Sequence, residues 1–216
     1  MTAPVSSNIH GIVFDLDGTL YVCDAFAASI QAAATAYIAG IKGINPPEAE
    51  LLMAATRLRL SEESGTLQTL SAVCMDLGGS VRELHSFFEK KLRPEACLVR
   101  DERVNQLLTR LSESFPLYIY TNYNRALATL MISYLGLDGL FSGLFAIDDN
   151  WKAKPDEEML TRIIAEIGFS PAEVLFVGDR YDVDLRAPEQ LGCPVYLSQS
   201  VEQLLRLEEL LKPYHP

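Results

Sequence analysis

The stretch GIVFDLDGTLY, residues 11–21, decides the fold. Three apolar β-formers lead directly into Asp15, Leu16 and Asp17, and Gly18 follows. In an extended chain residues i and i+2 face the same side, so both carboxylates point one way and Leu16 points the other. Gly18 then permits a tight turn. Two carboxylates this close persist where a cation or a shared proton lies between them. The pattern predicts a buried strand that ends in an acidic ligand site.

After this strand the sequence has a region of helical patterns, and then strand-like and helical patterns alternate. Between residues 20 and 95 the periodicity is helical, with helices expected at 25–40, 48–60, 66–77 and 81–92. Gly40 is expected to end the first of these, and Pro155 to open a later one. Further strands are expected at 116–120, 144–147, 173–177 and 194–197, and further helices at 101–113, 124–135, 155–167, 184–191 and 200–212.

Alternating strands and helices predict a parallel sheet that is covered on both faces. We therefore predict an α/β fold, a doubly wound parallel-sheet core that is interrupted by an α-helical cap. The core takes residues 1–20 and 96–216, and the cap takes residues 21–95.

Composition limits the kinds of partner. The 216 residues are 49% hydrophobic and 22% charged, which is typical of a globular chain. A net charge of −11 disfavours nucleic acid and anionic membrane, but it allows a small phosphorylated substrate beside a bound cation. No apolar run approaches the ~20 residues of a membrane span. The four cysteines are scattered, which favours a cytoplasmic location. The oligomeric state stays open.

Three more polar positions follow predicted strands or precede predicted helices. Thr121 comes directly after LYIY, where it either binds an anion or caps the next helix. Lys154 precedes Pro155 and is either a charge-neutralising group or a solvated lysine. Asp179 follows the strand VLFVG, and aspartates are hard oxygen ligands that suit magnesium.

These motifs carry a family resemblance. DLDGT behind an apolar strand resembles the first motif of the haloacid dehalogenase superfamily, whose members are mostly magnesium-dependent phosphatases. Thr121, Lys154 and the segment that starts at Asp179 resemble the second, third and fourth motifs, in the family's order. A helical insert between the first two motifs is similar to the capped members, the phosphoglycolate phosphatase and nucleotidase type. The resemblance covers essentially the whole chain.

The resemblance implies a mechanism and a set of site residues. Asp15 would attack phosphorus, and Asp17 would protonate the leaving oxygen and then activate water. The backbone near Leu16, together with Thr121, Asn122 and Lys154, would bind the phosphoryl group. Mg²⁺ would be held by Asp15, the backbone carbonyl of Asp17, Asp179 and a second acid. Asp184 fits the family spacing for that acid, with Asp182 as the competitor, and the Lys-Pro pattern selects Lys154 over Lys152.

The expected function is therefore a magnesium-dependent phosphatase that hydrolyses a small soluble phosphomonoester through an aspartyl-phosphate intermediate. A sugar phosphomutase uses the same four motifs and is the alternative. A catalytically silent binding or regulatory protein is a further one, although such proteins typically lose one of the acids. Dehalogenating relatives need no second acid, so Asp17 in its DGT context argues against that class.

Overall fold

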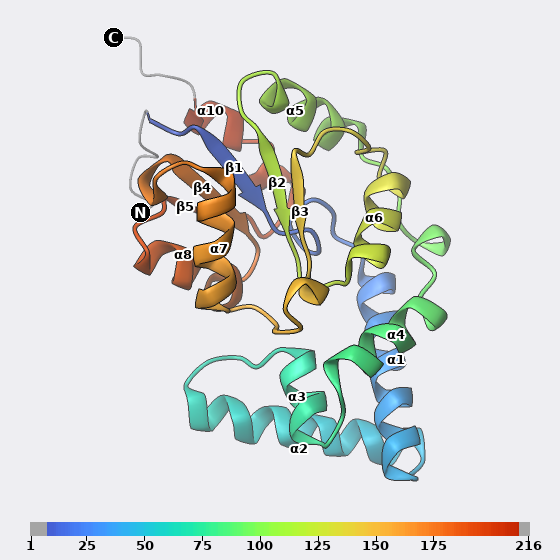
Figure 1. The fold of residues 1–216 in the computed structure, drawn as a ribbon. Coiled ribbons are helices and arrows are strands. Elements are labelled where there is room, and N and C mark those ends of the chain that lie inside the picture. Colours follow the sequence, from blue (N-terminus) through green and yellow to red (C-terminus); the bar gives the residue numbers. More distant parts are fainter. Residues whose placement is uncertain (1–7, 212–216) are drawn as a thin grey trace. The chain divides into compact units, whose positions relative to one another are not determined.

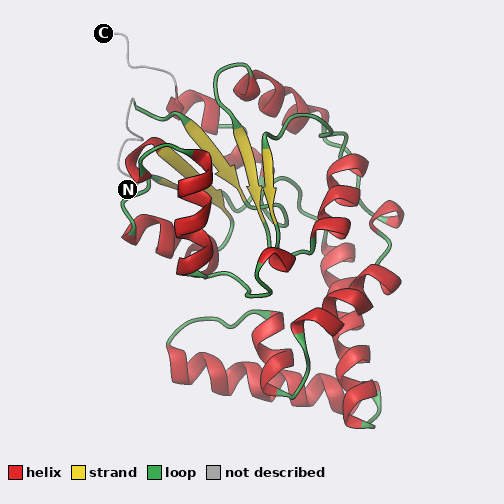
Figure 2. Cartoon of the chain, viewed as in Figure 1, coloured by secondary structure: helices red, strands yellow, loops and turns green. Residues whose placement is uncertain are grey.

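The protein is described here by a computed structural model that covers residues 8–211. It divides into two compact units (Figures 1 and 2). One unit consists of residues 8–22, 99–150 and 154–211, and the other of residues 23–98 and 151–153.

The first unit is built on a five-stranded sheet in which every paired strand is parallel, in the order β3-β2-β1-β4-β5. The strands are β1 (Gly11–Phe14), β2 (Leu117–Tyr120), β3 (Gly143–Phe145), β4 (Val174–Gly178) and β5 (Val195–Leu197). β1 lies at the centre, with Phe14 opposite Ile119 on one side and Val177 on the other. This order confirms the doubly wound α/β core that the alternating pattern predicts.

Both faces of the sheet are buried, which is why β1 and β4 read as unbroken apolar runs. On one face Val13 and Phe176 pack against α7 (Glu157–Ile167), whose side chains form a continuous core with them. Ile12 and Phe14 alternate with Val13 and are fully buried. The central strand is thus held by apolar contacts over its whole length.

The remaining helices of this unit begin and end near the expected residues. They are α5 (Glu102–Ser112), α6 (Arg125–Tyr134), α8 (Arg186–Gln190), α9 (Val201–Leu204) and α10 (Leu207–Leu211). Asp101 caps α5 and Asn124 caps α6, each through a side-chain oxygen that accepts a backbone N–H. The last two helices occupy the stretch where a single helix is expected.

Two local expectations within this unit are wrong. Pro155 does not open a helix, because Asp156 keeps an extended backbone and α7 begins only at Glu157. The helix expected at 184–191 starts earlier, as one π-helical turn (Tyr181–Leu185) that continues into α8.

The second unit is the helical insertion between β1 and β2. Its helices are α1 (Asp24–Lys42), α2 (Pro46–Ser64), α3 (Leu70–Asp76) and α4 (Val81–Lys91). α1 packs against both α2 and α4, and the side chains of Phe26, Met53 and Leu84 are fully buried. The expected stop at Gly40 is wrong: α1 continues to Lys42 and ends where Gly43 takes a left-handed φ of 66°.

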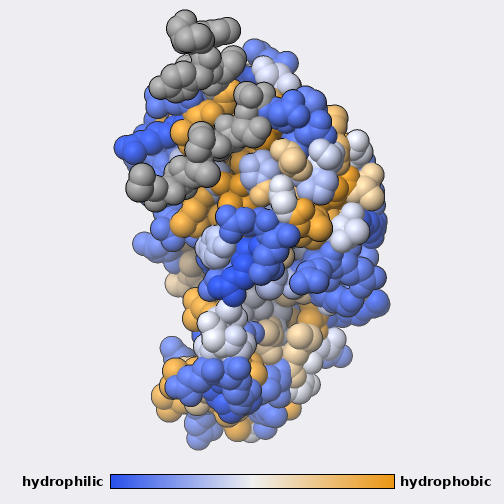
Figure 3. Space-filling model, turned by 90° about the vertical axis from the view of Figure 1, so that its left-hand side faces the viewer, coloured by the Kyte–Doolittle hydropathy of each residue, from blue (hydrophilic) through white to orange (hydrophobic). Residues whose placement is uncertain are grey.

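One face of the molecule is largely polar. Figure 3 shows hydrophilic residues spread over much of the face in view, broken by smaller apolar areas. Within residues 8–211 none of the helices is long and apolar enough to cross a membrane.

Candidate active site

The site lies where the central strands end. Asp15 N donates to Val177 O at 2.8 Å, and Thr121 N donates to Phe145 O at 2.9 Å, so the sheet pattern continues one residue past β1 and β2. Asp179 follows the last residue of β4. Because parallel strands end at the same edge, these three residues are brought to one side of the sheet.

Lys154 joins two of the carboxylates. Its Nζ donates to Asp15 Oδ1 at 2.5 Å, to Asp184 Oδ1 at 2.6 Å and to the backbone oxygen of Tyr120 at 3.0 Å. The Lys154 side chain is only 2% exposed, and those of Asp15 and Asp184 are 3% exposed. Lys152, the sequence competitor, is exposed. A buried ammonium with three acceptors neutralises charge here and is not a solvated lysine.

The loop after β2 holds Lys154 in place. Asn122 Oδ1 accepts a hydrogen bond from the backbone nitrogen of Lys154 at 2.7 Å. Thr121 is buried, and its Oγ1 accepts a hydrogen bond from Tyr123 N at 3.2 Å, which leaves its hydroxyl proton for another acceptor. Leu16 is fully buried, so only its backbone is available to a ligand. Asn122 therefore acts on the lysine loop in this structure.

Asp184 and Asp182 have different surroundings. Asp184 Oδ2 accepts from Arg180 N at 3.1 Å while its other oxygen meets Lys154. Asp182 instead pairs with Arg186, and its side chain is 35% exposed. Both acids lie in the π-helical turn, but only Asp184 is buried there. Asp184 joins the buried cluster and Asp182 does not.

Three carboxylates form a candidate cation site. One oxygen from each of Asp15, Asp179 and Asp184 lies within 4.8 Å of the others. Asp15 Oδ2 and Asp179 Oδ1 are buried and make no hydrogen bond, although Arg180 Nε lies 3.5 Å from the latter. Buried oxygens without donors are what a hard cation such as Mg²⁺ satisfies. The donor set therefore fits magnesium.

Glycine is required beside this site. Gly18 has a φ of +84°, and a Cβ at this position would lie 2.5 Å from Asp179 Oδ2. The turn after Asp17 is thus packed directly against the acid that follows β4. A side chain at Gly18 would therefore displace Asp179.

The electrostatics of the cluster favour a positive charge beside these acids. Burial raises the pKa of Asp15 to about 6, with Lys154 acting against the shift and Asp184 adding to it. Burial and the charge of Asp15 raise the pKa of Asp179 to about 7. Burial alone would raise the pKa of Asp184 too, but Lys154 and Arg180 lower it. Asp15 and Asp179 therefore ionise at higher pH than an ordinary aspartate, and a bound cation would favour their charged forms.

Comparison with known proteins identifies the family. A family model described as haloacid dehalogenase-like hydrolase matches residues 9–192. The chain is a haloacid dehalogenase-like hydrolase.

Three relatives show the range of that likeness. A phosphoglycolate phosphatase of Salmonella typhi is 27% identical over 202 residues, which is 87% of this chain and 80% of the relative. A putative HAD-hydrolase of Bacillus subtilis, solved bound to magnesium, superposes with a TM-score of 0.61 at 18% identity over 95% of this chain and all of the other. A 2-haloacid dehalogenase of Pseudomonas syringae superposes with a TM-score of 0.59 at 20% identity, over 94% of this chain and 98% of the other. The two structures are similar in fold alone, so the reaction must be argued from the site.

The hydrolase has two polar neighbours of the acids that sequence reasoning missed. The hydroxyl of Tyr123 donates to Asp17 Oδ2 at 3.0 Å. Arg180 lies beside Asp179 and Asp184, 3.5 Å and 3.8 Å from their nearest oxygens. Arg180 follows Asp179 directly, so its place in the fourth motif is a signal in the sequence. The contact of Tyr123 with Asp17 has no such signal, because it joins residues that are 106 positions apart.

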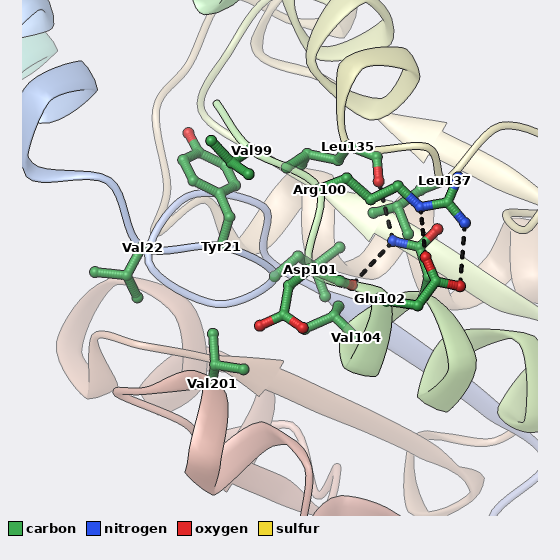
Figure 4. Close-up of a pocket in the computed structure, with 12 residues that line it drawn as sticks. Tyr21, Val22, Val99, Arg100, Asp101, Glu102, Val104, Leu135, Leu137 and Val201 are labelled. Carbon is green, nitrogen blue, oxygen red and sulfur yellow. Dashed lines mark hydrogen bonds and ion pairs between the residues drawn. The ribbon is translucent and has the colours of Figure 1, made fainter. Parts of the chain in front are cut away.

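A separate cavity of about 330 Å³ lies within the first unit (Figure 4). Tyr21, Val99 and Arg100 are among the residues that line it, and none of the four acids at the site does. Its charged groups are already paired, with Arg100 Nε 2.9 Å from Glu102 Oε2. The cavity is thus distinct from the acidic cluster.

Proposed function

We propose that this hydrolase is a magnesium-dependent phosphatase that cleaves a small phosphomonoester through a phosphoryl group carried on Asp15. The observation that carries the proposal is the buried cluster of Asp15, Lys154 and Asp184, in which Asp15 Oδ2 makes no hydrogen bond. Lys154 thus holds the Asp15 side chain through Oδ1 while Oδ2 has no donor, and a carboxylate held in this way is a suitable nucleophile.

In the first step the Asp15 carboxylate forms a bond to phosphorus, and the bond from phosphorus to the leaving oxygen breaks. Asp17 gives its proton to that oxygen, so an alcohol departs. Lys154, the Thr121 hydroxyl and the backbone amides of the nucleophile loop stabilise the equatorial oxygens of the phosphoryl group.

In the second step water attacks the phosphorus of the aspartyl phosphate. Asp17, now a carboxylate, takes a proton from the water as the new bond forms, and the bond between phosphorus and Asp15 breaks. Inorganic phosphate leaves and Asp17 is protonated again, so the cycle closes. The same side chain serves as acid and then as base.

Asp15, Asp179 and the backbone carbonyl of Asp17 would hold Mg²⁺, with Asp184 beside them. When bound, the ion would supply positive charge that favours attack by Asp15 on the phosphoryl group. The orphaned oxygens of Asp15 and Asp179 support this assignment.

Two observations favour a phosphatase over other chemistry. Asp17 lies in the same loop as Asp15 and accepts a hydrogen bond from the Tyr123 hydroxyl. A reaction that attacks a carbon–halogen bond does not need this second acid. The Salmonella typhi phosphoglycolate phosphatase aligns with 87% of this chain, which supports a short phosphorylated acid as the first substrate to test. A small soluble substrate and a cytoplasmic location remain predictions from the sequence.

The test is phosphate release from a panel of phosphomonoesters that includes 2-phosphoglycolate, with Mg²⁺ and with a chelator. Wild-type protein should release phosphate only with Mg²⁺, and Asp15→Asn should release none. The matched control is Asp182→Asn, which removes an exposed acid of the same loop and should stay active. Activity that survives in Asp15→Asn, or that a chelator leaves intact, would contradict the proposal.

A further inference from the structure

Asp17 is held by a tyrosine from the loop after β2. The Tyr123 hydroxyl donates to Asp17 Oδ2 at 3.0 Å, and the Tyr123 side chain is buried, with only 7% of the residue exposed. A hydrogen bond to a carboxylate is stronger than one between neutral groups. This contact therefore restricts the one side chain to which both proton transfers are assigned.

The backbone around Tyr123 is fixed on both sides. Tyr123 N donates to Thr121 Oγ1 at 3.2 Å, and Tyr123 O accepts from Ile147 N at 3.0 Å. The next residue, Asn124, caps α6 by accepting from Leu127 N at 3.1 Å. Because the ring of Tyr123 is buried and its backbone is anchored, its hydroxyl has few alternative positions. The hydroxyl therefore donates to Asp17 from a fixed position.

A second tyrosine supports the same acid from its own loop. Gly18 N donates to Tyr21 O at 2.9 Å, and Asp17 and Tyr21 form an isolated parallel bridge. The loop thus returns beside Asp17, and Tyr21 is only 5% exposed. Burial, and interactions with Tyr123 and Asp17, raise the pKa of Tyr21 well above its ordinary value. Tyr21 therefore borders Asp17 as a buried, neutral side chain.

We propose that Tyr123 is a positioning residue for Asp17, with Tyr21 as its support, an inference that rests on the proposed function. Because Oδ2 accepts from Tyr123, the proton of neutral Asp17 is directed to Oδ1. Oδ1 is then the atom that delivers the proton to the leaving oxygen and later takes one from water. Without the Tyr123 hydroxyl the carboxyl group turns more freely and the proton is shared between both oxygens.

This role has a consequence that a structural role lacks. General acid catalysis contributes roughly 10²–10⁴-fold to rate. It matters most for a leaving group that is a strong base, and hardly at all for p-nitrophenolate, which departs as a stable anion. Loss of Asp17 positioning should therefore make the rate depend more steeply on leaving-group acidity.

The experiment measures kcat/KM for a series of substituted phenyl phosphates with wild type, Tyr123→Phe and Asp17→Asn. For Tyr123→Phe we expect a fall of about 10-fold or more with the most basic phenol and less than about 3-fold with p-nitrophenol. Asp17→Asn should give the steepest dependence. Because every substrate passes through the same phosphoenzyme, kcat for its hydrolysis should fall in Tyr123→Phe whichever phenol has left.

Controls separate this role from a general loss of structure. Tyr118→Phe removes a hydroxyl from a half-buried tyrosine of β2 that lies against Phe145, and it should keep the wild-type slope. Tyr21→Phe should steepen the slope less than Tyr123→Phe, and the double variant should approach Asp17→Asn. Phenylalanine keeps the buried ring, so each variant should melt near the wild-type temperature.

The outcomes distinguish this inference from the proposed function. An active wild type whose plot of kcat/KM coincides with that of Tyr123→Phe would overturn the positioning role alone. An equal fall in kcat/KM with every phenol would also overturn it, because that marks a purely structural effect. A wild type without activity on any phosphate ester, with Mg²⁺ present, would overturn the proposed function and this inference with it.

Discussion

Lys154 Nζ lies 2.6 Å from Asp184 Oδ1 and at the same time 2.5 Å from Asp15 Oδ1, so one buried ammonium is shared by two buried carboxylates. Burial opposes its charge, yet the two acids raise the pKa of Lys154 above its ordinary value. Removal of one member of a buried ion pair leaves an uncompensated charge, which costs about 3–5 kcal/mol.

Lys154→Met should therefore lower the free energy of unfolding by about 3–5 kcal/mol in chelator, as well as abolish turnover. Lys152→Met is the matched control, because that lysine is exposed and its loss should change stability by less than about 0.5 kcal/mol. Urea denaturation of both variants measures the difference. Equal midpoints would mean that the buried ammonium contributes nothing to the fold.

The two candidate acids of the fourth motif, Asp184 and Asp182, have different partners and should respond differently to substitution. Asp184→Asn removes a charge from the buried cluster and should weaken Mg²⁺ binding and kcat by about 10–100-fold, the usual effect of an outer partner of a metal site. Asp182→Asn breaks an exposed pair with Arg186 and should cost less than about 1 kcal/mol of stability without loss of activity. Isothermal titration with Mg²⁺ and phosphatase assays compare them. A larger loss in Asp182→Asn would assign the second acid to that residue.

Substitution of Gly18 by alanine should disturb the site through a steric clash as well as through backbone strain. An added Cβ would lie 2.5 Å from Asp179 Oδ2, so Gly18→Ala should displace that acid and weaken Mg²⁺ binding. Gly139→Ala is the control, because Gly139 has a φ of +77° but nothing within 4 Å of the added Cβ. It should lose only the ~1–2 kcal/mol of a left-handed alanine. Similar Mg²⁺ affinity in both variants would contradict the displacement.

Much of the fold could be predicted from the sequence because the signals for its strands and helices are local. Apolar runs such as those of β1 and β4 are buried on both faces, and strand-end acids such as Asp15 and Asp179 follow them directly. Gly40 misled because the favourable helix formers around it outweigh the ~1 kcal/mol cost of a glycine inside a helix. The hydrogen bond from Tyr123 to Asp17 had no local signal, since it depends on the register of β1 against β2.

The stabilising effect of Mg²⁺ should increase with pH. In the ion-free protein Asp15 and Asp179 have pKa values of about 6 and about 7, above the ~3.9 of an unfolded aspartate. The folded protein therefore binds more protons than the unfolded chain between those values, and its stability falls as pH rises through the window from about 4 to 7. Mg²⁺ competes with these protons, so it binds more tightly as they leave.

We expect the difference in Tm between samples with Mg²⁺ and samples with chelator to be larger at pH 8 than at pH 5.5. Scanning calorimetry at both pH values measures it, and Asp179→Asn serves as the control because it lacks one of the two titrating ligands. In that variant the difference should be smaller and should change less with pH. A Mg²⁺ effect on wild type that is equal at both pH values would mean that Asp15 and Asp179 do not bind the ion, since binding to these carboxylates must release their protons.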